Sequence, residues 1–250
     1  NDYVGGKITS LNSKGYRWDM GPSLLTMPQY IEELFELFGE NSKDHFNYKK
    51  KEILCNYFWE DGTIFSAKAK PSAFANEASE AFNVDPEVIT NYLKKSRLKY
   101  DLTAPIFLEK SLHRWTTYFT FATLKALINA FRLNLFESLH EFNQRKLKDK
   151  KLIQFFNRFA TYNGSSPYET PGIMSMIPHL EMGFGTYFPK GGMNQISQSL
   201  YRLALTKGAK FYLSSPVTEI IHDNKKISGV MSVGEIHKCD LIICNMDIYS

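Results

Sequence analysis

The sequence has few cysteines and no long apolar run, and each absence argues against a class of protein. Its three cysteines, Cys55, Cys239 and Cys244, have no C-x-x-C spacing. A disulfide framework or a zinc site is therefore not expected. The protein is instead expected in a reducing, cytoplasmic compartment. No run approaches the roughly 18 apolar residues that mark a transmembrane helix. No signal peptide is visible at the amino end either.

Dense charge and the common catalytic motifs are also missing. A net charge of +4 over 250 residues is too small for the basic face of a nucleic-acid-binding protein, so no nucleic-acid partner is expected. No Ser/His/Asp spacing, H-E-x-x-H motif or P-loop occurs, and no metal site is predicted. What is present is apolar material, 43% hydrophobic and 14% aromatic, which is enough for a sizeable core.

The order of local patterns predicts an α/β (α+β) fold interrupted by helices. Glycine-punctuated strands are expected over 5–26, a helix over 28–39, and short strands over 46–66 with a hairpin turn at Asp61-Gly62. Residues 72–182 have mainly helical patterns, with Pro86 in the first turn of a long helix. A helix over 195–207 and strands over 211–213, 217–222, 227–233 and 240–245 follow, the last one fully buried. The predicted domains are 1–71, 72–182 and 183–250. Because both ends are abrupt, we expect a fragment of a longer chain.

The stretch Gly183–Met193 is the most informative segment. Its doublet Gly191-Gly192 indicates main chain that closely approaches another group. The helix beginning near Asn194 is expected to offer unpaired amides, which suit a polar or anionic group. A tight turn that enters a helix explains the same pattern.

Four segments, in this order and over nearly the whole chain, carry a resemblance: Val4–Lys7, Gly15–Ser23, Ala160–Tyr168 and Tyr187–Met193. With them the sequence resembles the carotenoid desaturase (phytoene dehydrogenase-type) family of FAD-dependent, amine-oxidase-like flavoproteins. The resemblance implies part of an FAD-binding, Rossmann-like domain, interrupted by a mainly helical substrate or membrane domain. The family's G-x-G-x-x-G unit and carboxy-terminal part have no counterpart in these residues.

The same resemblance implies positions for the cofactor FAD. Candidate FAD-binding residues are Gly5, Gly6 and Lys7 near the ribose and pyrophosphate; Gly21, Pro22 and Ser23 near the flavin ring; Val217 near the adenine; and Asn245 and Asp247 at the end of a returning strand. Lys7 stands where arginine is common, so it supplies charge without the guanidinium fork.

Substrate and catalytic positions are less sharply indicated. By resemblance, Gly191, Gly192 and Met193 border the flavin and a substrate channel. Tyr162, Tyr168 and Tyr187 could line an apolar channel, although ordinary core packing explains them equally well. No catalytic residue is identified. His179 and Glu181 could act near the flavin, but a salt bridge or surface pair explains them better, and Asp19 is expected to fix its turn.

Residues 115–142 combine aromatic and leucine side chains with scattered cations, and a basic run follows. This composition suits a helix that lies on an anionic membrane surface, and it predicts a cytoplasmic protein that associates peripherally with membranes. A helical lid packed on its own domain is the alternative.

The expected activity is FAD-dependent desaturation of a carotenoid, either phytoene or a later, 1-hydroxylated intermediate, by hydride transfer to flavin. The expected partner is a long apolar polyene, and the sequence does not identify the electron acceptor. Alternatives are another amine-oxidase-like flavoprotein such as a retinol saturase, or a noncatalytic relative that binds carotenoid or membrane.

Overall fold

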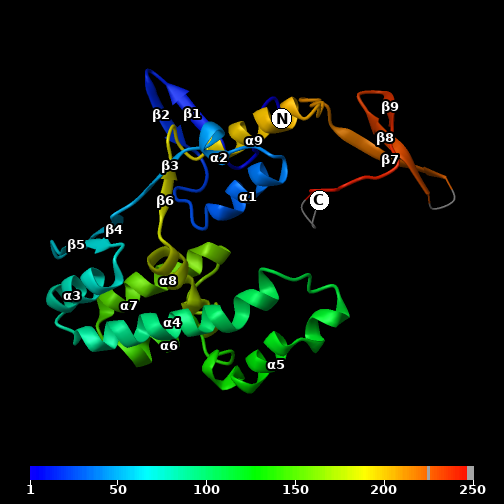
Figure 1. Cartoon of the computed structure of the whole chain (residues 1–250). Coiled ribbons are helices and arrows are strands. Elements are labelled where there is room, and N and C mark those ends of the chain that lie inside the picture. The colour runs from blue at the N-terminus through cyan, green and yellow to red at the C-terminus, as the bar shows by residue number, and fades with distance from the viewer. Residues whose placement is uncertain (224–225, 247–250) are drawn as a thin grey trace. The chain divides into compact units, whose positions relative to one another are not determined.

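The computed structural model describes residues 1–223 and 226–246, in a mixture of helices and strands (Figure 1). The chain divides into two units. Unit 1 comprises Asn1–Pro22 and Gly191–Ser250, and unit 2 comprises Ser23–Lys190. The mixed helix and sheet content agrees with the predicted class. The predicted domain limits, at 71/72 and 182/183, differ from the limits of these units and stay predictions.

Unit 1 contains a hairpin, a helix and a small sheet. Strands β1 (Ser10–Ser13) and β2 (Tyr16–Asp19) pair antiparallel. Helix α9 (Gln195–Thr206) follows the glycine doublet, within one residue of the predicted range. Strands β7 (Val217–Asp223), β8 (Lys226–Ser232) and β9 (Glu235–Lys238) form an antiparallel sheet in that order. The strands predicted over 217–222 and 227–233 are thus confirmed.

Two predicted strands of unit 1 are wrong. Residues 211–213 are irregular, and the Phe211 ring packs against Tyr201 of α9, with 4.5 Å between ring centroids. Residues 240–245, predicted as a buried strand, are also irregular, and Ile243 is 88% exposed. An apolar run forms a buried strand only where a neighbouring strand pairs with its backbone. Among the described residues, none pairs with this run.

Short strands bring distant parts of unit 2 together. Strand β3 (Tyr48–Lys50) pairs antiparallel with β6 (Tyr187–Pro189). Strands β4 (Ile53–Phe58) and β5 (Ile64–Lys68) form the predicted hairpin, whose turn residue Gly62 has a φ of 82°. Helices α1 (Gln29–Leu37) and α2 (Ser42–His45) precede β3 in the chain.

Helices dominate residues 72–182, as the pattern predicted. They are α3 (Pro71–Phe82), α4 (Pro86–Phe107), α5 (Phe121–Ile128), α6 (Leu139–Leu147), α7 (Lys150–Asn157) and α8 (Ile177–His179). Four 3₁₀ turns, η1 (Trp115–Phe119), η2 (Ala130–Arg132), η3 (Arg158–Asn163) and η4 (Gly172–Met176), and the π-turn η5 (Leu180–Phe184) connect them. Pro86 opens α4 as predicted, and the Asp85 side chain accepts the Glu87 amide at 2.8 Å.

The core of unit 2 lies among α3, α4, α6, α7 and the β4–β5 hairpin. Phe74 of α3 and both Phe155 and Phe156 of α7 are fully buried there. Tyr92 of α4 packs on Phe156 with 4.2 Å between ring centroids. Each such ring contributes about 1.5–3 kcal/mol through burial, so this cluster holds the helices that carry the features described next.

Candidate functional site

Two glycines of unit 1 allow the Val4–Lys7 turn to pack tightly. A Cβ atom at Gly21 would collide with the Lys7 carbonyl oxygen, and one at Gly5 would collide with the Ser197 hydroxyl of α9. Any other residue at these positions would push the segments apart. The structure therefore brings the predicted residues Gly5, Lys7 and Gly21 together.

Gly192 makes the close approach that the glycine doublet predicted, and its neighbour is Arg17. Gly192 has a φ of 93°, and a Cβ atom there would overlap the Arg17 guanidinium. Arg17 in turn pairs with Asp19 at 2.7 Å. Sequence reasoning missed Arg17, although its position two residues before Asp19 on one strand places both side chains on one face.

The first amides of α9 are occupied rather than free. Asp19 Oδ1 accepts the Met193 amide at 3.1 Å, and the amides of Gln195 and Ile196 bond to backbone carbonyls at 3.1 Å each. The amides at this helix start are therefore not unpaired as predicted, but the anionic group that they suit is present, and it is the Asp19 carboxylate of the same chain. Partial burial alone would raise the pKa of Asp19, but hydrogen bonds from Arg17 and Met193 outweigh it and lower that pKa. Asp19 fixes its turn, as expected.

The Gly5-Gly6-Lys7 turn has an open backbone. Its backbone has φ values of 100° at Gly5 and 51° at Gly6, and a Cβ atom at Gly6 would meet nothing within 4 Å. The Lys7 side chain beside it is exposed. A bare, positive-φ backbone next to an ammonium group suits a diphosphate. These residues thus fit the phosphate part of a dinucleotide.

The other predicted cofactor residues that the structure describes are exposed at the surface. Pro22 and Ser23 are exposed on either side of the limit between the units, and Val217 begins β7 with an exposed side chain. Asn245 is exposed in irregular chain, and Asp247 lies outside the described residues.

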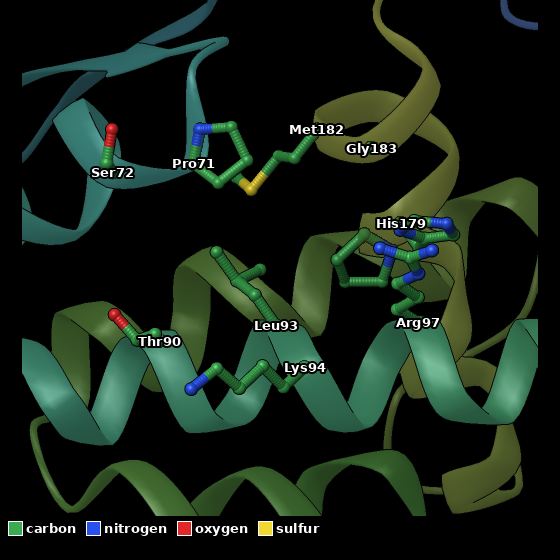
Figure 2. Close-up of a pocket in the computed structure, with 10 residues that line it drawn as sticks. Pro71, Ser72, Thr90, Leu93, Lys94, Arg97, His179, Met182 and Gly183 are labelled. Carbon is green, nitrogen blue, oxygen red and sulfur yellow. The ribbon is translucent and has the colours of Figure 1, made fainter.

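Unit 2 contains a cavity of about 480 Å³ between α3, α4 and the α8–η5 segment. Figure 2 shows Pro71, Leu93 and Met182 around it, with Arg97 and His179 at one end. Thr90, Leu93, Lys94 and Arg97 recur at helical spacing along α4, so they share one face. That spacing was the signal that could have identified them.

His179, a candidate from the sequence, lies in this cavity. Burial, opposed by Asp101 and assisted by Arg97, lowers the pKa of His179. The imidazole is therefore neutral near pH 7 and packs on Phe184 with 5.0 Å between ring centroids. Gly183 of the π-turn leaves room for it, because a Cβ atom there would collide with the imidazole.

Glu181, two residues later, belongs to a buried network instead. It is 1% exposed and accepts hydrogen bonds from Arg158 at 2.8 Å and from the Tyr162 hydroxyl at 2.6 Å. Arg158 also donates to the Tyr57 hydroxyl at 2.7 Å. Burial and the Glu181 carboxylate raise the pKa of Tyr162. The network ties β4, η3 and η5 together.

The predicted channel residues are divided between the two units, and the three tyrosines have different partners within unit 2. Tyr162 is bound to Glu181, whereas Tyr168 is exposed and packs on His140 with 4.5 Å between ring centroids. The Tyr187 hydroxyl donates to the Phe184 carbonyl at 3.0 Å. These tyrosines lie in unit 2, while Gly191, Gly192 and Met193 lie in unit 1. None of the six lines the cavity of Figure 2.

Residues 107–136, here called the apolar segment, project beyond the end of α4 (Figure 1). Their exposed apolar side chains include Phe107, Trp115, Phe119, Phe121, Leu127, Ile128, Phe131 and Phe136. The exposed cations Lys110, Arg114, Lys125 and Arg132 are interspersed. Contiguous apolar exposure of this kind marks a contact surface. Within the part of the chain that the structure describes, no helix is long and apolar enough to cross a membrane.

Comparison with known sequences gives concordant matches. The family described as flavin containing amine oxidoreductase matches residues 1–250. A 1-hydroxycarotenoid 3,4-desaturase from Flavobacterium sp. (strain P99-3) is 49% identical over 249 residues, which cover 100% of this chain and 51% of the relative. A phytoene desaturase from Phycomyces blakesleeanus is 28% identical over 253 residues, which cover 99% of this chain and 43% of the relative.

Solved structures of two oxidoreductases have a fold similar to that of this chain. An oxidoreductase from Methanosarcina mazei matches with a TM-score of 0.57 and 17% identity, over 95% of this chain and 49% of that one. A putrescine oxidase matches with a TM-score of 0.55 and 16% identity, over 93% of this chain and 48% of that one. The chain spans about half the length of the curated relatives that it matches.

Proposed function

Because the chain belongs to the flavin-containing amine oxidoreductase family, we propose that it is part of an FAD-dependent desaturase that acts on a carotenoid. The observation that carries the proposal is 49% identity, over the whole chain, to a 1-hydroxycarotenoid 3,4-desaturase. A 1-hydroxylated carotenoid is accordingly the substrate favoured over phytoene.

The Gly5-Gly6-Lys7 turn is the part of this chain that would hold the cofactor. Its open backbone at Gly6 and the exposed Lys7 ammonium would bind the pyrophosphate. Asp19 and Arg17 would act indirectly, since they fix the Gly192 turn and the start of α9. When bound, FAD supplies a two-electron acceptor for the hydride removed from one carbon, while the adjacent carbon loses a proton.

An amine substrate is disfavoured by the charges around the cavity of unit 2. Lys94 and Arg97 are the residues of permanent charge that line it among the described residues, and Arg97 pairs with Asp101 at 3.5 Å, which leaves the Lys94 ammonium to repel a protonated amine. An apolar chain would contact the side chains of Leu93 and Met182.

The activity is tested with the purified full-length protein, FAD and carotenoids in liposomes. We expect a flavin absorption spectrum, and a red-shifted product spectrum when a 1-hydroxylated carotenoid is supplied, because each new double bond lengthens the polyene. A protein that cannot be reconstituted with FAD would refute the proposal. Conversion of phytoene alone would overturn the substrate assignment but not the reaction class.

We further propose that the apolar segment docks on a membrane, from which a water-insoluble polyene can be drawn. Its exposed rings and interspersed cations are the features that support this docking.

Replacement of Phe131 and Phe136 by serine tests the docking. Both rings are exposed, so the folded state should be retained while binding to liposomes falls about tenfold or more, since each buried ring contributes about 1.5–3 kcal/mol. Phe58→Ser is a matched control, because Phe58 is 73% exposed and Phe131 76%, but Phe58 lies outside the segment. Equal liposome pelleting of all variants would contradict the proposal.

A further inference from the structure

A buried lysine of unit 2 donates its hydrogen bonds to neutral groups. Lys99 of α4 is 1% exposed, and its Nζ donates to the Gly172 carbonyl at 3.0 Å and to the Ser175 hydroxyl at 2.5 Å. The same Nζ lies 3.9 Å from the centroid of the Phe142 ring. Among the described residues, no carboxylate forms an ion pair with it. Buried ammonium groups normally have a carboxylate or another anion as partner.

Lys99 lines a cavity of about 330 Å³ whose other charged residues are all cations. These are Lys95 of α4, Arg132 of η2, and Arg145 and Lys146 of α6. Arg145 pairs with Glu137 at 2.5 Å, but within 1–223 and 226–246 no ion pair involves the other four cations. Burial and the nearby Lys95 lower the pKa of Lys146. Positive charge is therefore in excess in this cavity, which folding alone would disfavour.

An apolar cavity adjoins the cationic one. It has a volume of about 500 Å³ and is lined by Phe131, Leu135 and Phe136 of the apolar segment. Asn134 lines both cavities. Glu137, which also borders the apolar cavity, is already bound by Arg145 and by Asn134, the latter at 2.6 Å. The pair of cavities thus matches a molecule with an anionic head beside a hydrocarbon tail.

We propose that the cationic cavity binds the phosphate of an anionic phospholipid whose hydrocarbon chains contact Phe131, Leu135 and Phe136. The lipid phosphate would supply the negative charge that the cavity lacks. Free phosphate would satisfy the cations but leave the adjoining apolar cavity exposed. The proposal rests on the membrane docking proposed above, to which it adds a specific headgroup site.

The test compares binding of the full-length protein to vesicles of phosphatidylcholine, with and without phosphatidylglycerol. In one variant, Arg132→Gln and Lys146→Gln remove two cavity cations. In the matched variant, Lys110→Gln and Lys125→Gln remove two cations of the apolar segment that lie outside the cavity. Two cations that only lie near an anionic surface contribute about 30-fold in affinity together, which is the loss expected of the matched variant. Cations in direct contact with a phosphate contribute more than that, so the cavity variant should lose about 150-fold or more in its affinity for anionic vesicles.

Each outcome distinguishes the two proposals. Equal losses in both variants, or no preference of the wild type for anionic vesicles, would overturn the headgroup site and leave the docking intact. Failure of the wild type to bind any vesicle would refute the docking and the site together. Inorganic phosphate, titrated by calorimetry, gives the last arm. If inorganic phosphate binds as tightly as the anionic vesicles do, the cavity binds a free anion, and the proposal of a phospholipid is overturned.

Discussion

At the residue scale, Lys99 is a cation whose charged form is destabilised by folding. Burial, together with Arg145, Lys95 and Lys146, lowers the pKa of Lys99 from 10.5 to about 7, against the opposing effect of Glu137. Below about pH 7 Lys99 is protonated in both the folded and the unfolded state, and folding then carries the full free-energy cost of burying the charged ammonium. Between about pH 7 and 10.5 only the unfolded state holds it, so this residue makes stability rise with pH.

Lys99→Met should remove that contribution. The variant keeps the Gly172 carbonyl satisfied, because the Ser175 hydroxyl also donates to it at 2.6 Å. We expect the variant to gain stability relative to wild type, and the gain in the free energy of unfolding to be larger at pH 6 than at pH 9. Urea denaturation at both pH values measures this difference. Parallel pH dependences in the two proteins would show that Lys99 is not the titrating group.

Glu181 is expected to contribute to stability through its buried partners. Glu181→Gln leaves the Arg158 guanidinium without its counterion. Because Arg158 is partly exposed, we expect a loss of about 2–3 kcal/mol, at or below the low end for broken buried pairs. Denaturant unfolding measures it. Asp61→Asn is the matched control, since Asp61 pairs with Lys151 at the surface and should unfold like wild type. A Glu181→Gln variant as stable as this control would exclude the structural role and leave a chemical one.

At the scale of elements, the sequence predicted the structure correctly where the backbone hydrogen bonds are made between residues close together in the chain. The Asp61-Gly62 hairpin and the Pro86 helix start formed as predicted because turn chemistry and capping act over a few residues. Residues 240–245 failed because a strand needs a partner that no local pattern specifies.

Helix α6 follows the apolar segment and begins with a capping box. Ser138 accepts the Glu141 amide at 3.1 Å, and Glu141 accepts the Ser138 amide at 2.8 Å. Ser138→Ala should destabilise the protein by about 1 kcal/mol, whereas Ser138→Asp should retain most of the stability. Thermal unfolding of both variants checks this. Equal loss in both would show that the cap does not hold α6.

At the scale of the whole molecule, flavin binding and stability should be linked. A ligand that binds only the folded state adds about 2.7 kcal/mol at a concentration 100 times its Kd, so FAD should raise the melting temperature in proportion to the logarithm of its concentration. Lys7→Gln should weaken FAD about tenfold, since a charge-assisted contact to phosphate contributes about 1.5–3 kcal/mol. Lys14→Gln, an exposed control in the β1–β2 turn, should not. Equal FAD affinities would remove Lys7 from the site.

The candidate site could be predicted from the sequence only in part. Motifs identified Gly5, Gly21 and Gly192, because at these three positions glycine allows a close approach that a side chain would block. They could not identify what each glycine approaches, and Arg17, Ser197 and the cationic cavity emerged only from the tertiary contacts. The anionic group at the start of α9 could not be identified for the same reason, since Asp19 lies far away in sequence.

The pairing of Leu25 with Tyr187, through hydrogen bonds of 2.9 and 2.8 Å, places the two ends of unit 2 side by side. A stretch of chain whose entry and exit are neighbours can be lengthened, shortened or exchanged without altering the path of the flanking chain. Unit 2 is therefore an insertion that could be exchanged as a whole during evolution while the glycine turns of unit 1 stay the same.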